Sequence, residues 1–483
     1  MAKLYVFGIG GTGSRVIKAL SMLLASGVKL SNGFDTVVPI IIDPDTANGD
    51  LNRTADILTK YQNIYDEIGT NNNLFGTEIS SLTKLTNGKV SNLSNNFKFS
   101  VDGSGKKFGE SIDYNGLDKE NQALMDLLFS EDNIAADMTV GFKGNPNIGS
   151  IVLNKIVDST EYREFTNSFN QGDAIFIISS IFGGTGASGF PLLLKNLRQQ
   201  SSTVTHSNII SQSKIGAITF LPYFKVSEPE EVEDKAIDSA TFFSKAKAAL
   251  SYYEHSIFKN KSLDAFYHLG DHSNNNMEYA EGKGLQKNEA HFLEMAGALS
   301  IVDFVDSINN LNNTTKEFGI AQDANELQFE NLDTITKEKL TVPLSKLSLF
   351  QRFLETSIDE IKNSRGDFNN SAVTKNFYNQ DFYKSELSNF LSYYNEWLNE
   401  MNRNDISFSP FNDKQEHDKI LDFIKGKSPK QNFVKNKAKG DLIIKDLNKI
   451  TKDGVYKNEN EPSKFIKIFD KALENQIIEV LKN

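Results

Sequence analysis

The sequence predicts an α/β fold in which a parallel sheet carries helices on both faces, followed by a mostly helical C-terminal region. Apolar runs of strand length alternate with helical patterns from residue 3 to about residue 305, as they do in chains built from βαβ units. Two of these runs end in a burst of glycines that leads into a helical pattern. They are KLYVFGIGGTGSRVIKAL, Lys3 to Leu20, and IISSIFGGTGASGFPLLLKNLR, Ile177 to Arg198.

The predicted strands are short and apolar, with turn residues on either side, and cover residues 4–7, 36–42, 173–180, 214–224 and 263–271. Helical spacing of apolar residues or helix-forming composition predicts helices over 14–25, 50–61, 119–129, 189–199, 230–257 and 288–305. Pro39 inside the second strand predicts an edge or a bulge, because proline cannot donate to the ladder. Residues 68–117 are rich in Asn, Ser, Gly and Thr, and we expect an insertion or an extended loop there.

The C-terminal third is predicted to hold a strand near residues 327–332 and helices over 344–362, 381–401 and 462–481. We therefore expect an α/β domain over residues 1–287, a central core helix over 288–305 and a mostly helical domain over 306–483. Apolar residues form one face of the last helix, and docking on its own chain is the expected role of that face. Contact with a protein partner through the C-terminal helices is the alternative.

Bulk composition excludes several classes of protein. The net charge of −11 and the pI near 5.3 disfavour a nucleic-acid binder, because phosphate contacts need a basic surface. The chain contains no cysteine, which fits a reducing cytoplasm and excludes disulfides and thiolate metal sites. No stretch approaches the roughly 20 apolar residues of a membrane span, and the N-terminal stretch lacks the pattern of a signal peptide. We expect a cytoplasmic protein.

The two glycine runs suggest a phosphate cradle. The first N–H groups of a helix are unpaired and carry partial positive charge, and glycine lets an oxyanion approach them closely. The runs are Gly8-Ile9-Gly10-Gly11-Thr12-Gly13 and Gly183-Gly184-Thr185-Gly186-Ala187-Ser188-Gly189. If they lie at neighbouring strand ends, together they could hold a di- or triphosphate. The alternative is that tight packing alone requires these glycines.

The first run also satisfies G-x-G-x-x-G, the fingerprint of a Rossmann dinucleotide-binding enzyme. Asp43 ends the second predicted strand, where that fold has its ribose-binding acid, but it follows Gly8 by 35 positions rather than the usual ~20. A dinucleotide enzyme would leave Gly183–Gly189 without a function. Neither run contains a Walker G-x-x-x-x-G-K-[ST] pattern, which disfavours a P-loop ATPase.

The second run resembles the signature loop GGGTG(S/T)G of the tubulin/FtsZ superfamily of GTP-binding polymerising proteins, with Phe182 in place of the first glycine. Four further segments are similar to superfamily elements in the same order along the chain. They are GIGGTGSRV after the first strand, DPDTANGD after the second, GFKGNPNIG before the signature strand, and ITFLPYF at the fifth. Asn288 opens the long apolar helical pattern, where tubulins carry an asparagine that hydrogen-bonds guanine.

The resemblance covers residues 1–305 and implies a Rossmann-like GTP-binding domain that holds GTP or GDP. Mg²⁺ would be held through the nucleotide phosphates, with no direct protein ligand. The residues that the resemblance assigns to the nucleotide are Gly8, Gly10, Gly11, Thr12, Gly13, Asp43, Asp45, Gly144, Asn145, Gly183, Gly184, Thr185, Gly186 and Asn288. It further implies head-to-tail self-assembly into filaments, with GTP as the assembly switch.

The hydrolysis acids of the superfamily follow the long helix and reach the nucleotide of the next subunit. Residues 307–331 contain no clean copy of that pattern, and Asp323, Glu326 and Glu330 are the nearest carboxylates. The catalytic residues are therefore not identified, and Asp323 and Glu326 are the candidates. A nucleotide-binding scaffold without hydrolysis, bound to a partner through its C-terminal region, is the alternative to a GTPase, and a Rossmann dinucleotide enzyme is a second.

Overall fold

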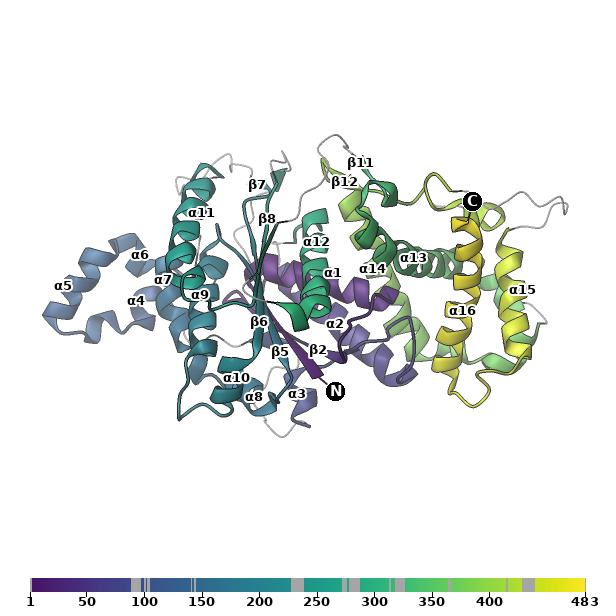
Figure 1. Cartoon of the computed structure of the whole chain (residues 1–483), viewed down its shortest axis with the longest axis horizontal. Coiled ribbons are helices and arrows are strands. Elements are labelled where there is room, and N and C mark those ends of the chain that lie inside the picture. Colours follow the sequence, from purple (N-terminus) through teal and green to yellow (C-terminus); the bar gives the residue numbers. More distant parts are fainter. Residues whose placement is uncertain are drawn as a thin grey trace.

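A parallel β-sheet forms the centre of the molecule in the computed structural model (Figure 1). The structure describes residues 2–87, 97–99, 101, 105–139, 141–142, 145–226, 239–271, 276–277, 287–311, 314–317, 326–363, 366–413, 416–427 and 439–482. Within these residues the strand order is β10-β8-β6-β5-β1-β2-β3, with β4 also paired to β2, and each pairing is parallel. The bounds are β1 Ala2–Ile9, β2 Phe34–Ile42, β3 Glu78–Ile79, β4 Lys98–Phe99, β5 Ala174–Ser180, β6 Lys214–Phe220, β8 Ala265–Leu269 and β10 Thr314–Glu317.

Helices cover both faces of this sheet, which confirms the predicted α/β fold class. On one face lie α1 (Gly10–Ser26), α2 (Gly49–Ile68) and α12 (Phe292–Ser307). On the other lie α7 (Pro146–Leu153), α8 (Thr160–Ser168), α9 (Gly184–Arg198), α10 (Ser207–Gln212) and α11 (Ser239–Tyr253). Strand side chains alternate between the two cores, as the period of a strand requires: Leu4 and Val6 enter the first core, Tyr5 and Phe7 the second.

Pro39 is accommodated by the arrangement at one end of the sheet. It lies in β2, which pairs with β1 along its whole length. On the other side of β2, β3 pairs with Thr36 and Val37, and β4 pairs with Ile41 and Ile42. Pro39 falls in the gap between these two-residue strands, where a missing N–H removes no ladder hydrogen bond. β2 is therefore not the edge strand of the sheet. Only two short strands flank it on that side, one near each of its ends.

Several predicted helices begin at different residues in the structure. The helices after β1 and β5 begin at Gly10 and Gly184, inside the glycine runs, and not at the predicted residues 14 and 189. Gly10 has a φ of +73°, a left-handed backbone conformation that glycine adopts without strain. The prediction that Asn288 opens the long apolar helix is wrong, because α12 begins at Phe292. A capping box between His291 and Glu294 sets that start.

The C-terminal region is helical, as predicted, and its helices lie beyond α1 and α2 at the right of Figure 1. They are α13 (Thr334–Asn363), α14 (Ser388–Asn402), α15 (Lys439–Lys452) and α16 (Glu461–Leu481); α15 was not predicted. The apolar face of α16 packs on α13 and α15, which confirms docking on its own chain. The core of these helices is continuous with the core under the first face of the sheet. Among the described helices, none combines the length and apolar character of a membrane span.

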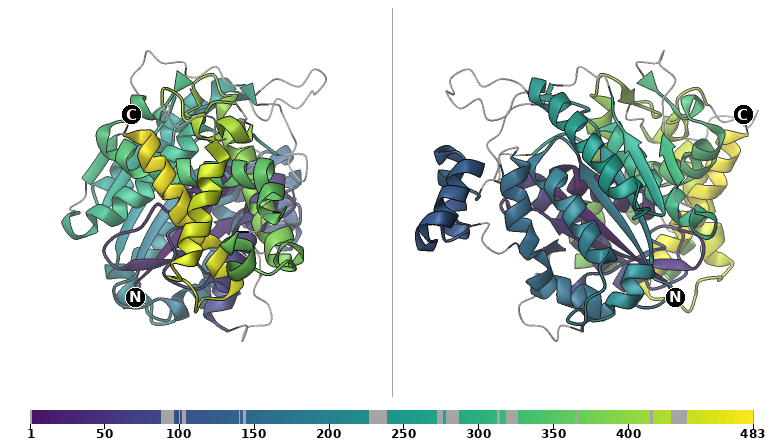
Figure 2. Two further views of the ribbon diagram at one scale, coloured as in Figure 1. Left: turned by 90° about the vertical axis from the view of Figure 1, so that its right-hand side faces the viewer. Right: turned by 60° about the vertical axis from the view of Figure 1, so that its left-hand side comes forward.

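Residues 105–137 form a projection that we call the arm (Figure 2). It consists of α4 (Phe108–Ser111), α5 (Lys119–Leu128) and α6 (Glu131–Ala135). Hydrogen bonds from Phe108 N to Ala136 O (2.9 Å) and from Met138 N to Lys106 O (3.3 Å) close its base. The predicted helix over 119–129 therefore exists but stands in the arm, away from the sheet. Of the predicted insertion, residues 68–87 instead return to the sheet through β3 and α3 (Leu82–Leu85).

Candidate functional site

The two glycine runs meet at one edge of the sheet. Strands β1 and β5 are hydrogen-bonded neighbours in parallel register, with Gly8 opposite Ile178. Their carboxyl ends therefore lie side by side, and so do the runs that follow them. A β-carbon built on Gly10 would stand 3.5 Å from Cβ of Thr185 and 3.7 Å from the backbone nitrogen of Gly186. Runs that are more than 170 positions apart in the chain thus form one surface.

The glycines of this surface fall into two groups. A β-carbon on Gly13 would lie 2.5 Å from the carbonyl carbon of Gly8, and one on Gly186 would lie 2.5 Å from the carbonyl oxygen of Ser180. Tight packing of each helix on its strand requires these glycines. By contrast, Gly11 and Gly183 are half-buried, and added β-carbons there would come no closer than 3.4 Å and 3.1 Å to side-chain atoms. Packing therefore explains only part of each run.

The helices that start in the two runs have no side-chain caps. The residues before them are Ile9 and Gly183, and neither offers a side-chain acceptor to the first turn. By contrast, a side chain of Asn48 caps α2 and a side chain of Asn145 caps α7. Two uncapped helix N-termini that face a common surface bring together N–H donors and the positive ends of two helix dipoles. Such a surface suits an anion with several oxygens.

Asp43 and Asp45 follow β2, which adjoins β1, so both lie at the same edge of the sheet. Both side chains are buried. An Asp43 carboxylate oxygen accepts a hydrogen bond from Asp45 N (3.1 Å), and Asp45 accepts one from Ala47 N (3.1 Å). Burial raises the pKa of Asp43 to about 7, and the neighbouring carboxylates Asp45 and Asp50 add to that increase.

Asn145 lies at the start of α7, the helix that packs against α9. Its side-chain oxygen accepts from Asn147 N (3.2 Å), and its amide donates to Asn133 in α6 (3.0 Å). The first turn of α7 lies near the second glycine run, since Pro146 and Gly183 line one cavity, and the side chain of Asn145 is bonded to the arm. Gly144 lies outside the described residues.

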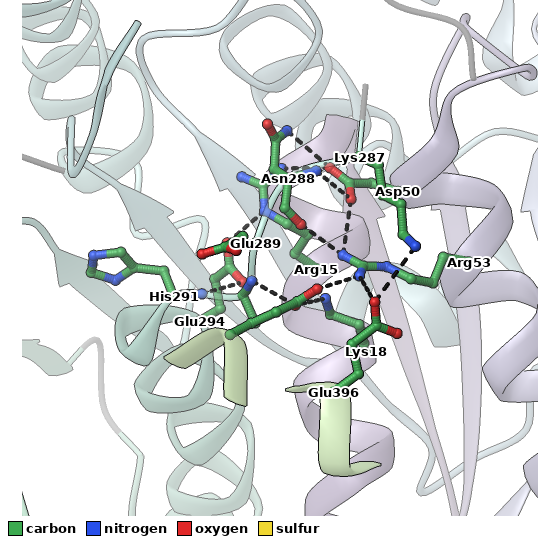
Figure 3. Close-up of polar contacts among 12 residues, drawn as sticks. Arg15, Lys18, Asp50, Arg53, Lys287, Asn288, Glu289, His291, Glu294 and Glu396 are labelled. Atoms are coloured by element: carbon green, nitrogen blue, oxygen red, sulfur yellow. Dashed lines mark hydrogen bonds and ion pairs between the residues drawn. The ribbon is translucent and has the colours of Figure 1, made fainter. Parts of the chain in front are cut away.

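Asn288 is held by α2. Its side-chain amide donates to Asp50 (2.9 Å), and its backbone N–H donates to the other oxygen of the same carboxylate (3.1 Å). Arg53 in turn donates to the carbonyl oxygen of Asn288 (2.6 Å). Figure 3 shows these contacts around Asp50. The Asn288 amide has a second N–H donor and a carbonyl oxygen, so a base could bind it without breaking the bond to Asp50.

Below the glycine surface lies a buried charge cluster that the sequence did not predict. We define it by the cations Arg15, Lys18 and Arg53 and the carboxylates Asp50, Glu294 and Glu400, all of them buried. Arg15 bridges Asp50 (3.2 Å) and Glu294 (2.5 Å). Arg53 bridges Glu400 (2.5 Å) and Asp50 (3.3 Å), and Lys18 pairs with Glu400 (3.3 Å). The three cations and the three carboxylates leave the cluster with no net charge.

Glu400 brings α14 of the C-terminal region into this cluster. It also accepts a hydrogen bond from Ala290 N (2.7 Å), just before α12. Burial alone would raise the pKa of Glu400, but Lys18 and Arg53 hold it below its usual range. Burial likewise lowers the pKa of Lys18, and Glu400 opposes that shift. Arg15 and Lys18 interrupt the apolar pattern of α1, and this interruption was the only sign in the sequence that these cations have buried partners. No pattern around Glu400 indicated that its carboxylate is buried.

The candidate hydrolysis acids are not brought to the glycine surface in the described part of the chain. Glu326 lies in β11 (Glu326–Leu327), which pairs with β12 (Ser407–Phe408). Its carboxylate accepts hydrogen bonds from Lys425 (2.7 Å) and Gln328 (3.0 Å), and these bonds lower its pKa. Asp323 lies outside the described residues.

Known proteins resemble the chain in structure. No protein-family model and no curated protein matches the sequence. CetZ2 from Haloferax volcanii, solved as a GTPγS-bound protofilament, is 14% identical, with 64% of this chain and 59% of that chain covered and a TM-score of 0.31. CetZ1 from the same organism, a GDP-bound monomer, is 12% identical, with 62% and 58% covered and a TM-score of 0.28. The chain thus spans less than two thirds of these CetZ structures.

TubZ of Bacillus thuringiensis serovar israelensis, a GTPγS-form protofilament, is 14% identical, with 81% of each chain covered and a TM-score of 0.27. CetZ and TubZ belong to the tubulin/FtsZ superfamily. At such low identities and TM-scores, these likenesses carry no conclusion about what this chain binds or does.

Removing Glu400 should destabilise the protein strongly. In Glu400→Ala, Lys18 and Arg53 stay buried with one carboxylate fewer, and breaking a buried ion pair in this way costs about 3–5 kcal/mol. Chemical denaturation of the full chain measures the change. Glu396→Ala is the matched control, because Glu396 lies one turn earlier on α14, is 41% exposed, and sits 3.6 Å from Arg53. It should cost less than about 1 kcal/mol. Equal losses in the two variants would contradict the role given to the cluster.

Stability should depend on pH through Asp43. Its pKa is about 7 in the folded protein against 3.8 ordinarily, so the folded state binds this proton more tightly. Ionisation of Asp43 therefore reduces stability as the pH rises between these values. Asp43→Asn should stabilise the nucleotide-free protein above pH 7, by about 2–4 kcal/mol, and the gain should vanish toward pH 4.

Thermal unfolding across that pH range measures the effect of Asp43→Asn. Asp381→Asn, at an exposed aspartate in the C-terminal region, is the control and should show no such trend. If Asp43→Asn stabilises the protein equally at pH 5 and at pH 8, the raised pKa of Asp43 is refuted.

Proposed function

We propose that this protein binds GTP or GDP, with Mg²⁺ held through the phosphates, at the carboxyl edge of its sheet. The contact between the two glycine runs, Gly10 against Thr185, carries the proposal. It joins two uncapped helix N-termini into one surface with half-buried Gly11, Gly183 and Thr185 facing outward. A single phosphate needs only one such terminus, whereas a polyphosphate can use both.

Each predicted site residue has a proposed role in this arrangement. The glycines of both runs, with Thr12 and Thr185, hold the α- and β-phosphates through main-chain amides. Asn145 and Gly144 lie toward the γ-phosphate. Asp43 and Asp45 face the nucleotide through Mg²⁺ or water, and bound Mg²⁺ would favour the ionised form of Asp43. Asn288 recognises guanine through its side-chain amide, one N–H of which donates to Asp50.

We propose further that the protein assembles head to tail into filaments, with GTP as the switch on subunit contacts. The CetZ2 and TubZ structures are protofilaments bound to GTPγS, and CetZ1 is a GDP-bound monomer. Head-to-tail contacts that do not close into a ring produce filaments.

A second candidate function is a nucleotide-binding scaffold that does not hydrolyse GTP. The ion pair of Glu326 with Lys425 favours it, because a neighbouring subunit would first have to draw this carboxylate away from Lys425. GTP turnover that stays negligible as the protein concentration rises supports the scaffold. Turnover that grows with concentration and is lost in Glu326→Gln supports a GTPase.

Mass spectrometry of the nucleotide released from freshly purified protein tests the proposal. We expect GTP or GDP. In Gly11→Asp a carboxylate enters the glycine surface without a packing clash, and like-charge repulsion should weaken GTP binding by about tenfold or more. Gly105→Asp adds the same charge at an open position in the arm and should bind normally. Release of NAD(P) instead would support a dinucleotide enzyme, and normal GTP binding by Gly11→Asp would contradict the site.

A further inference from the structure

The arm exposes an apolar face that its own chain does not cover. Leu124, Leu127 and Leu128 of α5 are 47%, 82% and 57% exposed. Spacings of three and four residues place them on one side of the helix. Two side chains of the arm are buried, Phe108 and Phe129, and their rings meet edge to face at 4.9 Å. No residue of α5 is buried, so this helix presents its leucines to the surroundings.

The arm is also acidic. Residues 105–137 contain eight carboxylates and three lysines, a net charge of −5. Acidic side chains flank the exposed leucines along α5, among them Glu120 and Asp126. This charge argues against an anionic membrane surface as the partner, because such surfaces attract basic segments. It favours a basic partner with an apolar centre.

Such a surface exists elsewhere on the same molecule, and we call it the α9–α11 groove. It is a cavity of about 830 Å³ between α7, α9 and α11, on the face of the sheet that carries α9. Apolar side chains, including Leu192, Leu194 and Ala249, make up much of its lining. Among the described residues that line it, Lys195, Arg198 and Lys245 are basic and none is acidic. The groove includes Gly183 but no residue of the first glycine run.

The arm of the same chain does not fill this groove, because Leu127 is exposed in the structure. We propose that the arm of one copy of this chain docks through Leu124, Leu127 and Leu128 into the α9–α11 groove of a second copy.

The exposed leucines match the apolar lining of the groove, and the acidic arm matches Lys195, an exposed cation of that lining; Arg198 is already paired with Asp264 (3.0 Å). Because the leucines and the groove are different patches, each copy can use both, and the contact can propagate from copy to copy. It requires no nucleotide, although the groove shares Gly183 with the proposed nucleotide surface.

Crosslinking tests this contact directly, because the chain contains no cysteine. A Leu127→Cys copy is mixed with a Gln199→Cys copy that carries a different tag, and a short bismaleimide is added. Gln199 lines the groove, and replacing it keeps all three basic residues. We expect dimers that contain one copy of each variant, with and without GTP. In the control, Asn115→Cys, at an exposed position of the arm outside α5, replaces Leu127→Cys, and the yield should be at least about tenfold lower.

Two further variants test the chemistry of the contact. Leu124→Asp in the Leu127→Cys copy puts a charge into the apolar groove and should lower the yield by about tenfold. Lys195→Glu in the Gln199→Cys copy reverses one charge of the groove lining and should also lower the yield, less so at high salt. Gly11→Asp should leave the yield unchanged, which separates this contact from nucleotide binding.

Three outcomes would overturn the proposal. The first is an equal yield with Asn115→Cys, which would mean random collision. The second is crosslinking only between two Leu127→Cys copies, which would mean that the arms pair with each other. The third is crosslinking only within a single chain that carries both Leu127→Cys and Gln199→Cys, which would mean that the arm closes onto its own groove.

Discussion

The buried charge cluster is the constraint on which the arrangement of the molecule depends. Its six charged groups come from α1, α2, α12 and α14, elements that are spread over nearly 400 positions of the chain. A buried charge without its partner costs several kcal/mol, so none of these elements can shift without leaving a group unpaired. The cluster therefore specifies how the C-terminal helices sit on the α/β part. The surrounding apolar core is less specific, because apolar contacts have no direction.

The same cluster connects the glycine surface to the C-terminal region. Helix α1 begins in the first glycine run and carries Arg15 and Lys18 within its next two turns. Asp50 bonds both Arg15 and Asn288, so it stands between that helix and the proposed base-binding residue. A ligand that draws Asn288 away would leave one oxygen of Asp50 short of a donor. Arg53 pairs with both Asp50 (3.3 Å) and Glu400 of α14 (2.5 Å).

The local patterns predicted the glycine surface well for a definite reason. Parallel strands end at the same edge of a sheet, so two strand–glycine–helix units that become neighbours must bring their glycines together. The sequence could not show that Gly8, Gly13 and Gly186 serve packing, while Gly11 and Gly183 face outward. The packing glycines and the outward-facing glycines are the same residue type within the same runs. Only the space around each glycine in the folded protein distinguishes them.

By itself the sequence determined the α/β class, the five strands β1, β2, β5, β6 and β8, the helical C-terminal region and the two glycine runs, because these follow from the local periodicity of apolar residues and from backbone chemistry. The tertiary structure alone decided which charges are paired. Lys18 meets Glu400 across 382 positions, and nothing local to either residue signals the other. It also decided that Asn288 precedes α12 and bonds Asp50, and that the helix over 119–128 stands in an arm. These outcomes depend on which surfaces meet in three dimensions, and periodicity along the chain carries no information about that.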